Sequence, residues 1–590
     1  MDQPMSSSYS LERVKLREHP LAYADYQAFE DALGWMFKSH AFWLPLVYRQ
    51  GLDVVAINDD VEGALCEALA PRCRRLVVLA ADEAAASSLQ ATADQAGLVN
   101  VEVVCFDWSG EWLIPDSSVD LVVLQRVNSW IEKAGLARAD LAGHILDQLV
   151  RLLGNDGSFL IVDNNPLNFR CLSKPLSCMS RFRAGKRYLA HAQVVDRMSS
   201  AGFRLQAMAG DFVFDRSMYP IPEFLDVRGP GLCGDVVRGR RQSLRRRIIN
   251  HPRVKEYWPS FLIAGSLAPS MALAGRICAQ YAQGDDATRT QGEEPAVVRR
   301  MVSGNSGVTV MIMGNVAGYD GDVVLRLATE EQGRETLARN ADTLAALREH
   351  REVPDLLLRG AMEGFDYSLE ACVKGMHVDD LDVEYDRCIE QAADLLLDIQ
   401  RTTSFRVILE GAEYERLVES EIARLDTFCC GSEKDDLAVI GRYLDSVLRG
   451  QEILLVRTHG DFKVGNVLFH ADGMPSAIID WEMSDARGLP LLDILLLVTD
   501  VSAREQGMKL PEVFLQELLP GRLRPFLDRL LEQARVRFGI APALQRGLGM
   551  MFWIQYLNRQ LEWPYRAHHE IAAAWVSEPL RRMAGMAHVD

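Results

Sequence analysis

One short segment of the chain carries the residue types that phosphoryl transfer requires. It runs from His459 to Phe469 and reads HGDFKVGNVLF. Asp461 in this segment suits the task of orienting an attacking hydroxyl and taking its proton. Asn466, and Asp480 in the later stretch IIDWE, are hard oxygen ligands of the kind that magnesium prefers. Each lies beside an apolar, strand-like run that would fix its position.

The order HGDxxxxN, IDWE and then GxPxxD, which ends at Asp493, resembles the aminoglycoside phosphotransferase and choline kinase superfamily. The resemblance covers roughly residues 295–563. It implies a protein that uses ATP, or another nucleoside triphosphate, with Mg²⁺. Asp461 would be the catalytic residue, Asn466 and Asp480 would be the metal ligands, and the substrate would be a small molecule with a hydroxyl group.

The alternative is that HGD occupies an ordinary turn and IDWE ends an ordinary strand, but the order and spacing of the two motifs argue against it. In this family His459 would brace the loop. Gly460 stands where regulated protein kinases usually carry an arginine that pairs with a phosphorylated activation loop. The segment between Asp480 and Asp493 is also too short for a long activation loop. Both points favour a constitutive kinase of small molecules.

Three residues of the expected nucleotide-binding lobe lie in the loop SGNSG, namely Gly304, Asn305 and Gly307. Backbone N–H groups in such a loop can lie over phosphates, although a plain hairpin turn is the alternative. Arg326 occupies the position of the phosphate-binding lysine of protein kinases, and arginine keeps the charge and can fork onto phosphate oxygens. Glu335, on the next expected helix, is the candidate partner of Arg326 or else a solvated residue.

The stretch from Glu370 to Val373 resembles the segment that connects the two lobes of a kinase. Its backbone would bind the adenine edge, so we include Glu370 among the cofactor-binding residues. Strands are expected at 297–303, 308–313, 323–327, 355–358 and 367–372, with a helix at 331–349. Five strands with one helix, followed by a helical region, match the α+β bilobal plan of protein kinases.

The N-terminal part alternates short apolar runs with helical patterns. Strands are expected at 52–57, 76–80, 101–106, 119–124 and 158–162, and helices at 62–70, 84–96 and 139–153. Short buried strands that alternate with helices predict a parallel sheet covered on both faces, an α/β Rossmann-like fold.

Five short landmarks follow one another in this part: GLVNV, FDW, PDSSVDLV, LLGNDG and AGF. In this order they resemble a class I S-adenosylmethionine-dependent methyltransferase over roughly residues 35–267. The family's glycine-rich D/ExGxGxG loop is missing, because residues 54–63 read VVAINDDVEG. The ribose-binding acid would fall at Ala80 or Ala81, where Asp82 is a shifted substitute.

Asp107 sits where this family contacts adenine. Two interpretations of the N-terminal part stay open. It is either a scaffold that has lost its cofactor, or a working methyltransferase with an unusual loop, so S-adenosylmethionine stays a candidate cofactor.

A polar stretch at residues 280–295, QYAQGDDATRTQGEEP, divides the chain. We therefore predict a methyltransferase-like domain at 1–280, a linker at 281–296, a kinase-like N-lobe at 297–375 and a helical C-lobe at 376–590.

Composition limits the partners. The 590 residues carry a formal net charge of -18, which disfavours nucleic acid and anionic membranes. Eleven cysteines without a CxxC pair fit reduced thiols in a cytosol. The longest apolar stretch, 261–275, is too short to span a bilayer, and no signal peptide is evident. We expect a cytoplasmic protein without a membrane span, and leave a protein partner or an oligomer open.

These patterns predict a kinase that phosphorylates a hydroxyl of a sugar, an aminoglycoside-like compound or an amino alcohol. One alternative is a bifunctional enzyme, or primarily a methyltransferase, in glycan or secondary-metabolite tailoring. The other is a non-catalytic scaffold. The sequence does not identify the acceptor, nor does it distinguish ATP from GTP.

Overall fold

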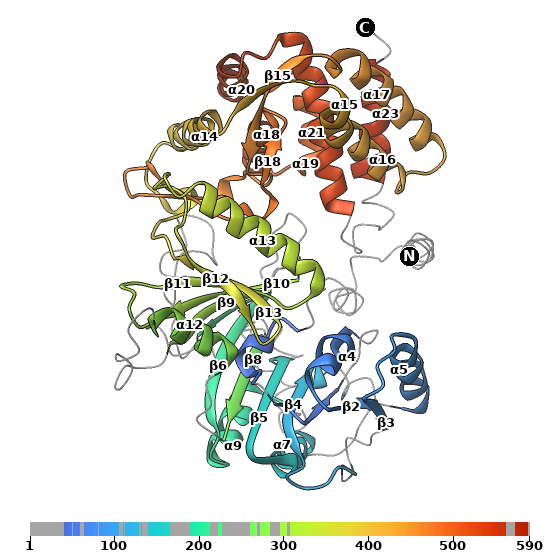
Figure 1. The fold of residues 1–590 in the computed structure, drawn as a ribbon, viewed down its shortest axis with the longest axis vertical. Helices are drawn as coiled ribbons and strands as arrows, with labels where there is room; N and C mark the ends of the chain where they lie inside the picture. The colour runs from blue at the N-terminus through green and yellow to red at the C-terminus, as the bar shows by residue number, and fades with distance from the viewer. Residues whose placement is uncertain are drawn as a thin grey trace, which may run out of the picture. The chain divides into compact units, whose positions relative to one another are not determined.

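The structure is a computed structural model of the chain (Figure 1). It describes residues 41–49, 51–58, 64–80, 82–105, 110, 112–128, 131, 140–165, 189–212, 222–226, 260–267, 272–283, 296–303, 307–561 and 573–587. Contacts divide the chain into two compact units. We call the first the sheet unit, which comprises Lys38–Leu337 and Leu356–Cys372, and the second the helical unit, which includes Ala338–Asp355 and Val373–Asp590.

The sheet unit begins with five parallel strands in the spatial order β3-β2-β1-β4-β5. Their bounds are β1 Val54–Ile57, β2 Arg75–Ala80, β3 Val101–Cys105, β4 Val119–Gln125 and β5 Leu153–Asn164. The helices of this region are α3 Leu44–Val47, α4 Ala64–Leu69, α5 Glu83–Gln95, α7 Leu141–Leu152, α9 His191–Ser200 and α12 Leu273–Gln283. The strands are rich in Val, Ile and Leu because the sheet is buried on both faces. The alternation of strands and helices predicted from the sequence is present.

The same sheet continues into the kinase-like strands. β5 is followed in space by β8 (Ser260–Ser266), β6 (Arg204–Phe212) and β7 (Pro222–Asp226), all antiparallel. β7 pairs with β9 (Val297–Ser303), and beyond it lie β10 (Val308–Gly314), β11 (Val323–Ala328), β13 (Phe365–Ala371) and β12 (Leu356–Met362). The result is one sheet of thirteen strands (Figure 1).

The two faces of strands β9 to β13 have different partners, because successive side chains point to opposite faces of a sheet. Leu325 and Leu327 join a buried cluster that also contains residues of α3 and α12. Ala328, on the other face, packs with Leu337 of α13 (Glu331–Ala346). Arg326 therefore lies on the face away from the N-terminal helices.

Aromatic and charged contacts tie the N-terminal part to the β12–β13 hairpin within the sheet unit. The ring of Phe365 lies edge-on to Tyr48 at 5.1 Å between centroids. The guanidinium carbon of Arg72 lies 4.4 Å from the centre of the same ring. Arg276 on α12 forms a 2.6 Å ion pair with Glu363 at the hairpin turn. The N-terminal part thus covers one face of the kinase-like strands and shares a core with them.

The helical unit surrounds two small sheets, β14-β15-β18 and β16-β17. Its strands are β14 Phe405–Ile408, β15 Glu452–Thr458, β16 Val467–Phe469, β17 Pro475–Ile478 and β18 Asp485–Gly488. Its helices are α14 Tyr385–Thr402, α15 Gly411–Tyr414, α16 Ser420–Asp426, α17 Ser432–Leu448, α18 Leu492–Gln506, α19 Leu510–Val513, α20 Pro525–Arg537, α21 Pro542–Leu561 and α23 Glu578–Ala587, with a π-helical turn at Glu415–Glu419.

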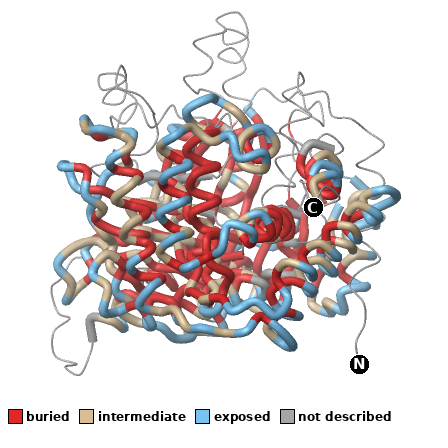
Figure 2. The backbone as a smooth tube through the Cα atoms, turned by 90° about the horizontal axis from the view of Figure 1, so that it is seen from above, coloured by how far each residue is buried: buried red, intermediate tan, exposed pale blue. Residues whose placement is uncertain are grey.

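Burial follows the sequence pattern of these helices. α14 buries one face, whereas the apolar sequence of α18 is buried continuously from Leu492 to Ala503. Figure 2 shows that buried residues alternate with exposed ones along some helices and follow one another along others. α18 is therefore a central helix of its unit. Its first turn contacts the loop of the candidate site.

Two further expectations bear on the arrangement of the chain. No helix in the described residues is long and apolar enough to cross a membrane. Of the expected linker, residues 284–295 lie outside the described ranges, while α12 runs to Gln283 and β9 starts at Val297. The domain boundaries at 280, 296 and 375 stay a prediction.

We expect Phe365→Ala to destabilise the whole sheet unit, because Phe365 is fully buried in the shared cluster. The loss should be about 3–5 kcal/mol in the free energy of unfolding of that unit. Hydrogen exchange of the full chain is the measurement. Faster exchange should reach both the parallel strands β1 and β4 and the antiparallel strands β11 and β13. Exchange that rises only in β10 to β13 would show that the two parts unfold independently.

Candidate active site

The loop that carries Asp461 follows directly from β15. Ile453, Leu455 and Val456 of this strand are buried, which anchors it between its neighbours β14 and β18. The chain then turns at Gly460, where φ is +84°. A Cβ at this position would collide with the carbonyl oxygen of Met483. Glycine is therefore required here by space and backbone conformation, and not only because a regulatory side chain is absent.

The carboxylate of Asp493 anchors this loop through hydrogen bonds to its backbone. It lies in the first turn of α18 and accepts the backbone N–H groups of His459 and Gly460, each at 2.8 Å. The side-chain amide of Gln400 donates a third hydrogen bond at 2.7 Å. Burial raises the pKa of Asp493, while the positive charges and N–H groups around it act in the opposite direction.

His459 also braces the loop. Its Nε2 lies 2.9 Å from the carbonyl oxygen of Ile479, and its ring packs 4.6 Å from that of Trp481. The imidazole thereby connects the Asp461 loop to the residue before Asp480. This geometry gives His459 a structural task, as the resemblance implied.

Two side chains of the same loop contact Asp461. Lys463 Nζ lies 2.6 Å from Asp461 Oδ1. Burial is the largest single effect and disfavours the charged amine, but Asp461, together with Tyr556 and Asp500, outweighs it and holds the pKa of Lys463 above its ordinary range. Asn466 Nδ2 donates to the carbonyl oxygen of Asp461 at 2.8 Å and to Oδ2 at 3.2 Å. These bonds turn the amide oxygen Oδ1 of Asn466 away from Asp461, where it can serve as a ligand.

A short hairpin brings Asn466 next to Asp480. Val467 of β16 pairs with Ile478 of β17, and the N–H of Ile479 donates to the carbonyl oxygen of Asn466 at 3.0 Å. Asp480 follows with φ +69°, a left-handed conformation that is unusual for a residue with a side chain. Such backbone strain is found at functional sites more often than elsewhere.

This donor set fits Mg²⁺ bound together with phosphates. Magnesium in phosphotransferases takes one or two protein carboxylates and completes its shell with phosphate oxygens and water. Asp480 and the amide oxygen of Asn466 match that pattern. In the described part of the chain no group of three His, Cys, Asp or Glu side chains is placed to hold a metal ion.

The sheet unit holds a second set of predicted residues. Arg326 on β11 lies 3.1 Å from the Glu370 carboxylate on the neighbouring strand β13, and both side chains are less than one-tenth exposed. Ser368 Oγ also lies 3.3 Å from that carboxylate. Glu335 is exposed on α13, and its pairing with Arg326 stays a prediction. Glu370 thus contacts the arginine through its side chain, and its backbone role at the adenine edge stays a prediction.

The expected phosphate loop is described only at its end. Gly307 has φ +72°, and its carbonyl oxygen accepts the N–H of Thr329 at 2.9 Å. Gly304 and Asn305 lie outside the described residues, and so does Asp107 of the N-terminal part.

Sequence reasoning missed three residues at this site. Lys463 lay in an unassigned position of the motif, and its distance of two residues from Asp461 was the available signal. Gln400 and Arg559 are far away in the sequence. Arg559, on α21, donates to the carbonyl oxygen of Gly460, and nothing in its local sequence predicts this contact.

Comparison with known proteins agrees with the resemblance. The profile of the phosphotransferase enzyme family matches residues 298–528. This range contains Arg326, Asp461, Asn466 and Asp480. The predicted family of the C-terminal part is therefore confirmed. Among curated proteins no sequence match was found.

Solved structures similar to the N-terminal part include S-adenosylmethionine-dependent methyltransferases. One, from Thermotoga maritima, is described as a possible histamine N-methyltransferase, with 12% identity, a TM-score of 0.27 and coverage of 42% of this chain and 96% of the other. Geranyl diphosphate C-methyltransferase from Streptomyces coelicolor also has 12% identity and a TM-score of 0.27, with coverage of 45% and 88%. An enzyme from Aquifex aeolicus has 12% identity and a TM-score of 0.23, with coverage of 40% and 99%.

We expect Gly460→Ala to disrupt the loop that carries Asp461. The left-handed backbone alone costs an alanine about 1–3 kcal/mol, and the new Cβ would press on the Met483 carbonyl. The melting temperature should fall. Gly507→Ala is the matched control, because Gly507 also has positive φ but no atom lies within 4 Å of its virtual Cβ. Equal losses in the two variants would mean that contact with Met483 has no effect.

Proposed function

We propose that this chain is a phosphotransferase that moves the γ-phosphate of ATP, or of another nucleoside triphosphate, onto a hydroxyl of a small molecule, with Mg²⁺ as cofactor. One observation carries the proposal: hydrogen bonds join Asn466 to Asp461 and to Ile479, the residue directly before Asp480, in one loop and hairpin system. The match of residues 298–528 to a phosphotransferase family supports it. A sugar, an aminoglycoside-like compound or an amino alcohol is the proposed acceptor.

In this proposal Asp461 is the base. Its carboxylate orients the acceptor hydroxyl and takes its proton as the hydroxyl oxygen attacks phosphorus. Lys463 and Asn466 fix the carboxylate through contacts at 2.6 and 3.2 Å, so that little reorganisation is needed when the acceptor arrives. Bound Mg²⁺ would neutralise the phosphate oxygens, and Asn466 and Asp480 would hold it.

Arg326 is the residue of the sheet unit that would contact phosphate. Its side chain lies on the sheet face that α13 covers and is balanced by Glu370 at 3.1 Å. A buried guanidinium without a counter-ion would be costly. The carboxylate of Glu370 therefore balances the charge of Arg326 and holds the side chain in place.

We expect Asp461→Asn to cut turnover by about 10²-fold or more, the scale of losing a general base. Folding and Mg²⁺-dependent nucleotide binding should persist. Asp480→Ala is the comparison, because it should abolish Mg²⁺-dependent binding. Turnover is measured as nucleoside triphosphate consumption over a panel of sugars, aminoglycosides and amino alcohols, and binding by calorimetry with and without Mg²⁺.

Near-normal turnover in folded Asp461→Asn would remove this residue from the role of base. Nucleotide binding by the parent protein that does not depend on Mg²⁺ would contradict the assignment of Asn466 and Asp480.

The second candidate function is methyl transfer by the N-terminal part. In open α/β sheets the ligand crevice lies at the carboxyl ends of the strands where the strand order reverses. Here that point lies between β1 and β4, which are neighbours although β2 and β3 separate them in the sequence. The crevice is where S-adenosylmethionine would have to bind.

Asn58 occupies this crevice. It follows β1 directly and is fully buried. Its Nδ2 donates to the carbonyl oxygen of Gln125 at 2.7 Å, and its Oδ1 accepts the N–H of Gln125 at 2.7 Å. The side chain thus bridges the ends of β1 and β4, where a cofactor-binding loop has glycine and open space. β2 ends at Ala80, which cannot bind a ribose hydroxyl through its side chain. These residues do not fit S-adenosylmethionine, so we propose that the N-terminal part serves to cover the kinase-like strands.

We expect the full chain to bind S-adenosylmethionine and S-adenosylhomocysteine with dissociation constants weaker than about 1 mM, or roughly -4 kcal/mol. Calorimetric titration is the measurement, with Mg²⁺-ATP as the positive control in the same preparation. The full chain is needed because truncation would expose the core that the N-terminal part shares with β9 to β13. A micromolar constant for either compound would make the protein bifunctional.

A further inference from the structure

The segment that follows Asp480 returns to β15 as the short strand β18. Only two residue pairs join the strands, Val456 with Gly488 and Thr458 with Asp485, and the register is irregular between them. So short a ladder does little by itself to fix β18 against β15. Yet the segment adjoins both candidate loops, because Thr458 directly precedes His459 and Asp485 lies five residues beyond Asp480.

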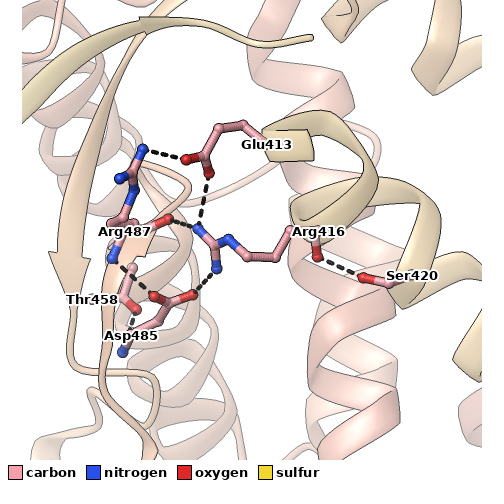
Figure 3. A network of polar contacts seen from close by, with 6 residues as sticks. All are labelled: Glu413, Arg416, Ser420, Thr458, Asp485 and Arg487. Carbon is pink, nitrogen blue, oxygen red and sulfur yellow. Dashed lines mark hydrogen bonds and ion pairs between the residues drawn. The ribbon is translucent and has the colours of Figure 1, made fainter. Parts of the chain in front are cut away.

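The side chain of Arg416 adds contacts that fix β18 in place (Figure 3). Its Nη1 donates to Asp485 Oδ2 at 2.8 Å, and its Nη2 donates to the main-chain carbonyl of Arg487. Glu413 contacts the guanidinium groups of both Arg416 and Arg487. One planar guanidinium thus grips a side chain and a main-chain atom of β18 together. We call Arg416, Glu413, Asp485 and Arg487 the Arg416 clamp.

Arg416 lies in one of three π-helical turns among the described residues, the others being Phe514–Leu518 and Ala573–Ser577. Glu415–Glu419 forms a π-helical turn between α15 and α16. Such turns are rare and are frequently found at functional sites. Ser420 Oγ donates to the carbonyl oxygen of Arg416 at 2.6 Å, which satisfies a main-chain acceptor in the wider turn.

The clamped segment presses on the loop of the proposed base. The N–H of Asp485 lies 3.4 Å from Thr458 Oγ1. The carbonyl oxygen of Met483 lies against Gly460, so closely that no Cβ fits between them. A shift of this segment would therefore move the Asp461 loop at one end and the Asp480 turn at the other.

We propose that Arg416 is a positioning residue of the phosphotransferase site, which fixes the distance between the base Asp461 and the metal ligand Asp480 by holding β18. The proposal rests on the proposed function. In regulated kinases a phosphate on the activation segment pairs with arginine to order it. In this chain the carboxylate of Asp485 is the permanent partner of Arg416, so the segment is ordered without modification.

A general stabilising role makes a different prediction. The four side chains of the clamp are between 24% and 50% exposed. Ion pairs at such positions contribute little to global stability. Loss of Arg416 should therefore leave the melting temperature nearly unchanged, while a positioning role should alter the response to Mg²⁺.

The test compares Arg416→Ala with the parent in the full chain. We expect turnover to fall about 10-fold or more, the scale of a small misplacement at a reacting centre. The Mg²⁺ concentration needed for half-maximal nucleotide binding should rise by a similar factor, and hydrogen exchange should accelerate at residues 481–488. Arg416→Lys keeps the charge but cannot make three contacts in one plane, so it should give an intermediate effect.

Arg449→Ala is the matched control. Arg449 lies just beyond α17, pairs with Glu419 and Asp445, and is 41% exposed against 42% for Arg416, but among the described residues it bonds neither Asp485 nor Arg487 of β18. It should leave the Mg²⁺ response unchanged. If Arg449→Ala shifts the Mg²⁺ requirement as much as Arg416→Ala does, the effect is not one of positioning.

Two outcomes separate the clamp from the function on which it rests. If Arg416→Ala matches the parent in Mg²⁺ response and exchange while Asp461→Asn is inactive, the positioning role is wrong and the phosphotransferase stands. If the parent neither binds Mg²⁺-ATP nor consumes it with any acceptor, the proposed function fails, and the positioning role in phosphoryl transfer is overturned with it.

Discussion

The carboxylate of Asp493 accepts the backbone N–H groups of two successive residues, His459 and Gly460, inside the protein. A buried carboxylate is tolerated only when its charge is met by donors. Here the donors are the backbone of the very loop that carries Asp461, and Gln400 adds a third. The energy of burying this charge is therefore coupled to the conformation of the loop. The position of the proposed base Asp461 therefore depends on Asp493, to which we assign no step of the reaction.

From this anchor the contacts spread without a break to the proposed metal ligands. Asn466 bonds Asp461 through its side chain and Ile479 through its carbonyl oxygen, and His459 reaches Ile479 from the other side. Asp480 follows directly. Because each hydrogen bond restricts the next, the loop, the hairpin and the turn form one unit. Such networks are worth more together than as separate pairs, which suits a site that must hold several oxygen atoms in fixed places.

The sequence predicted those parts of the site that local motifs encode. Asp461, Asn466, Asp480 and the strands beside them follow from residue type and spacing, and so did the alternation of strands and helices in the N-terminal part. Contacts between segments that are distant in the sequence were not predicted. The bond of Arg559 to Gly460 joins residues 99 positions apart, and the pairing of β7 with β9 carries one sheet across the expected linker. Neither leaves a local pattern, because each depends on how whole elements pack.

The shared core also gives the α/β fold a task that needs no cofactor, which is the role we propose for the N-terminal part. In a cofactor-binding domain, glycines keep the ends of β1 and β4 apart and open to the ligand. Asn58 instead joins them with two hydrogen bonds of 2.7 Å, which continue the ladder between the strands. In our proposal, Asn58 in place of glycine removes binding surface for a cofactor and makes the connection between the two strands more rigid. Rigidity is what a cover requires, since α3 and α12 contribute to the same buried cluster as β11 and β13, the strands that carry Arg326 and Glu370.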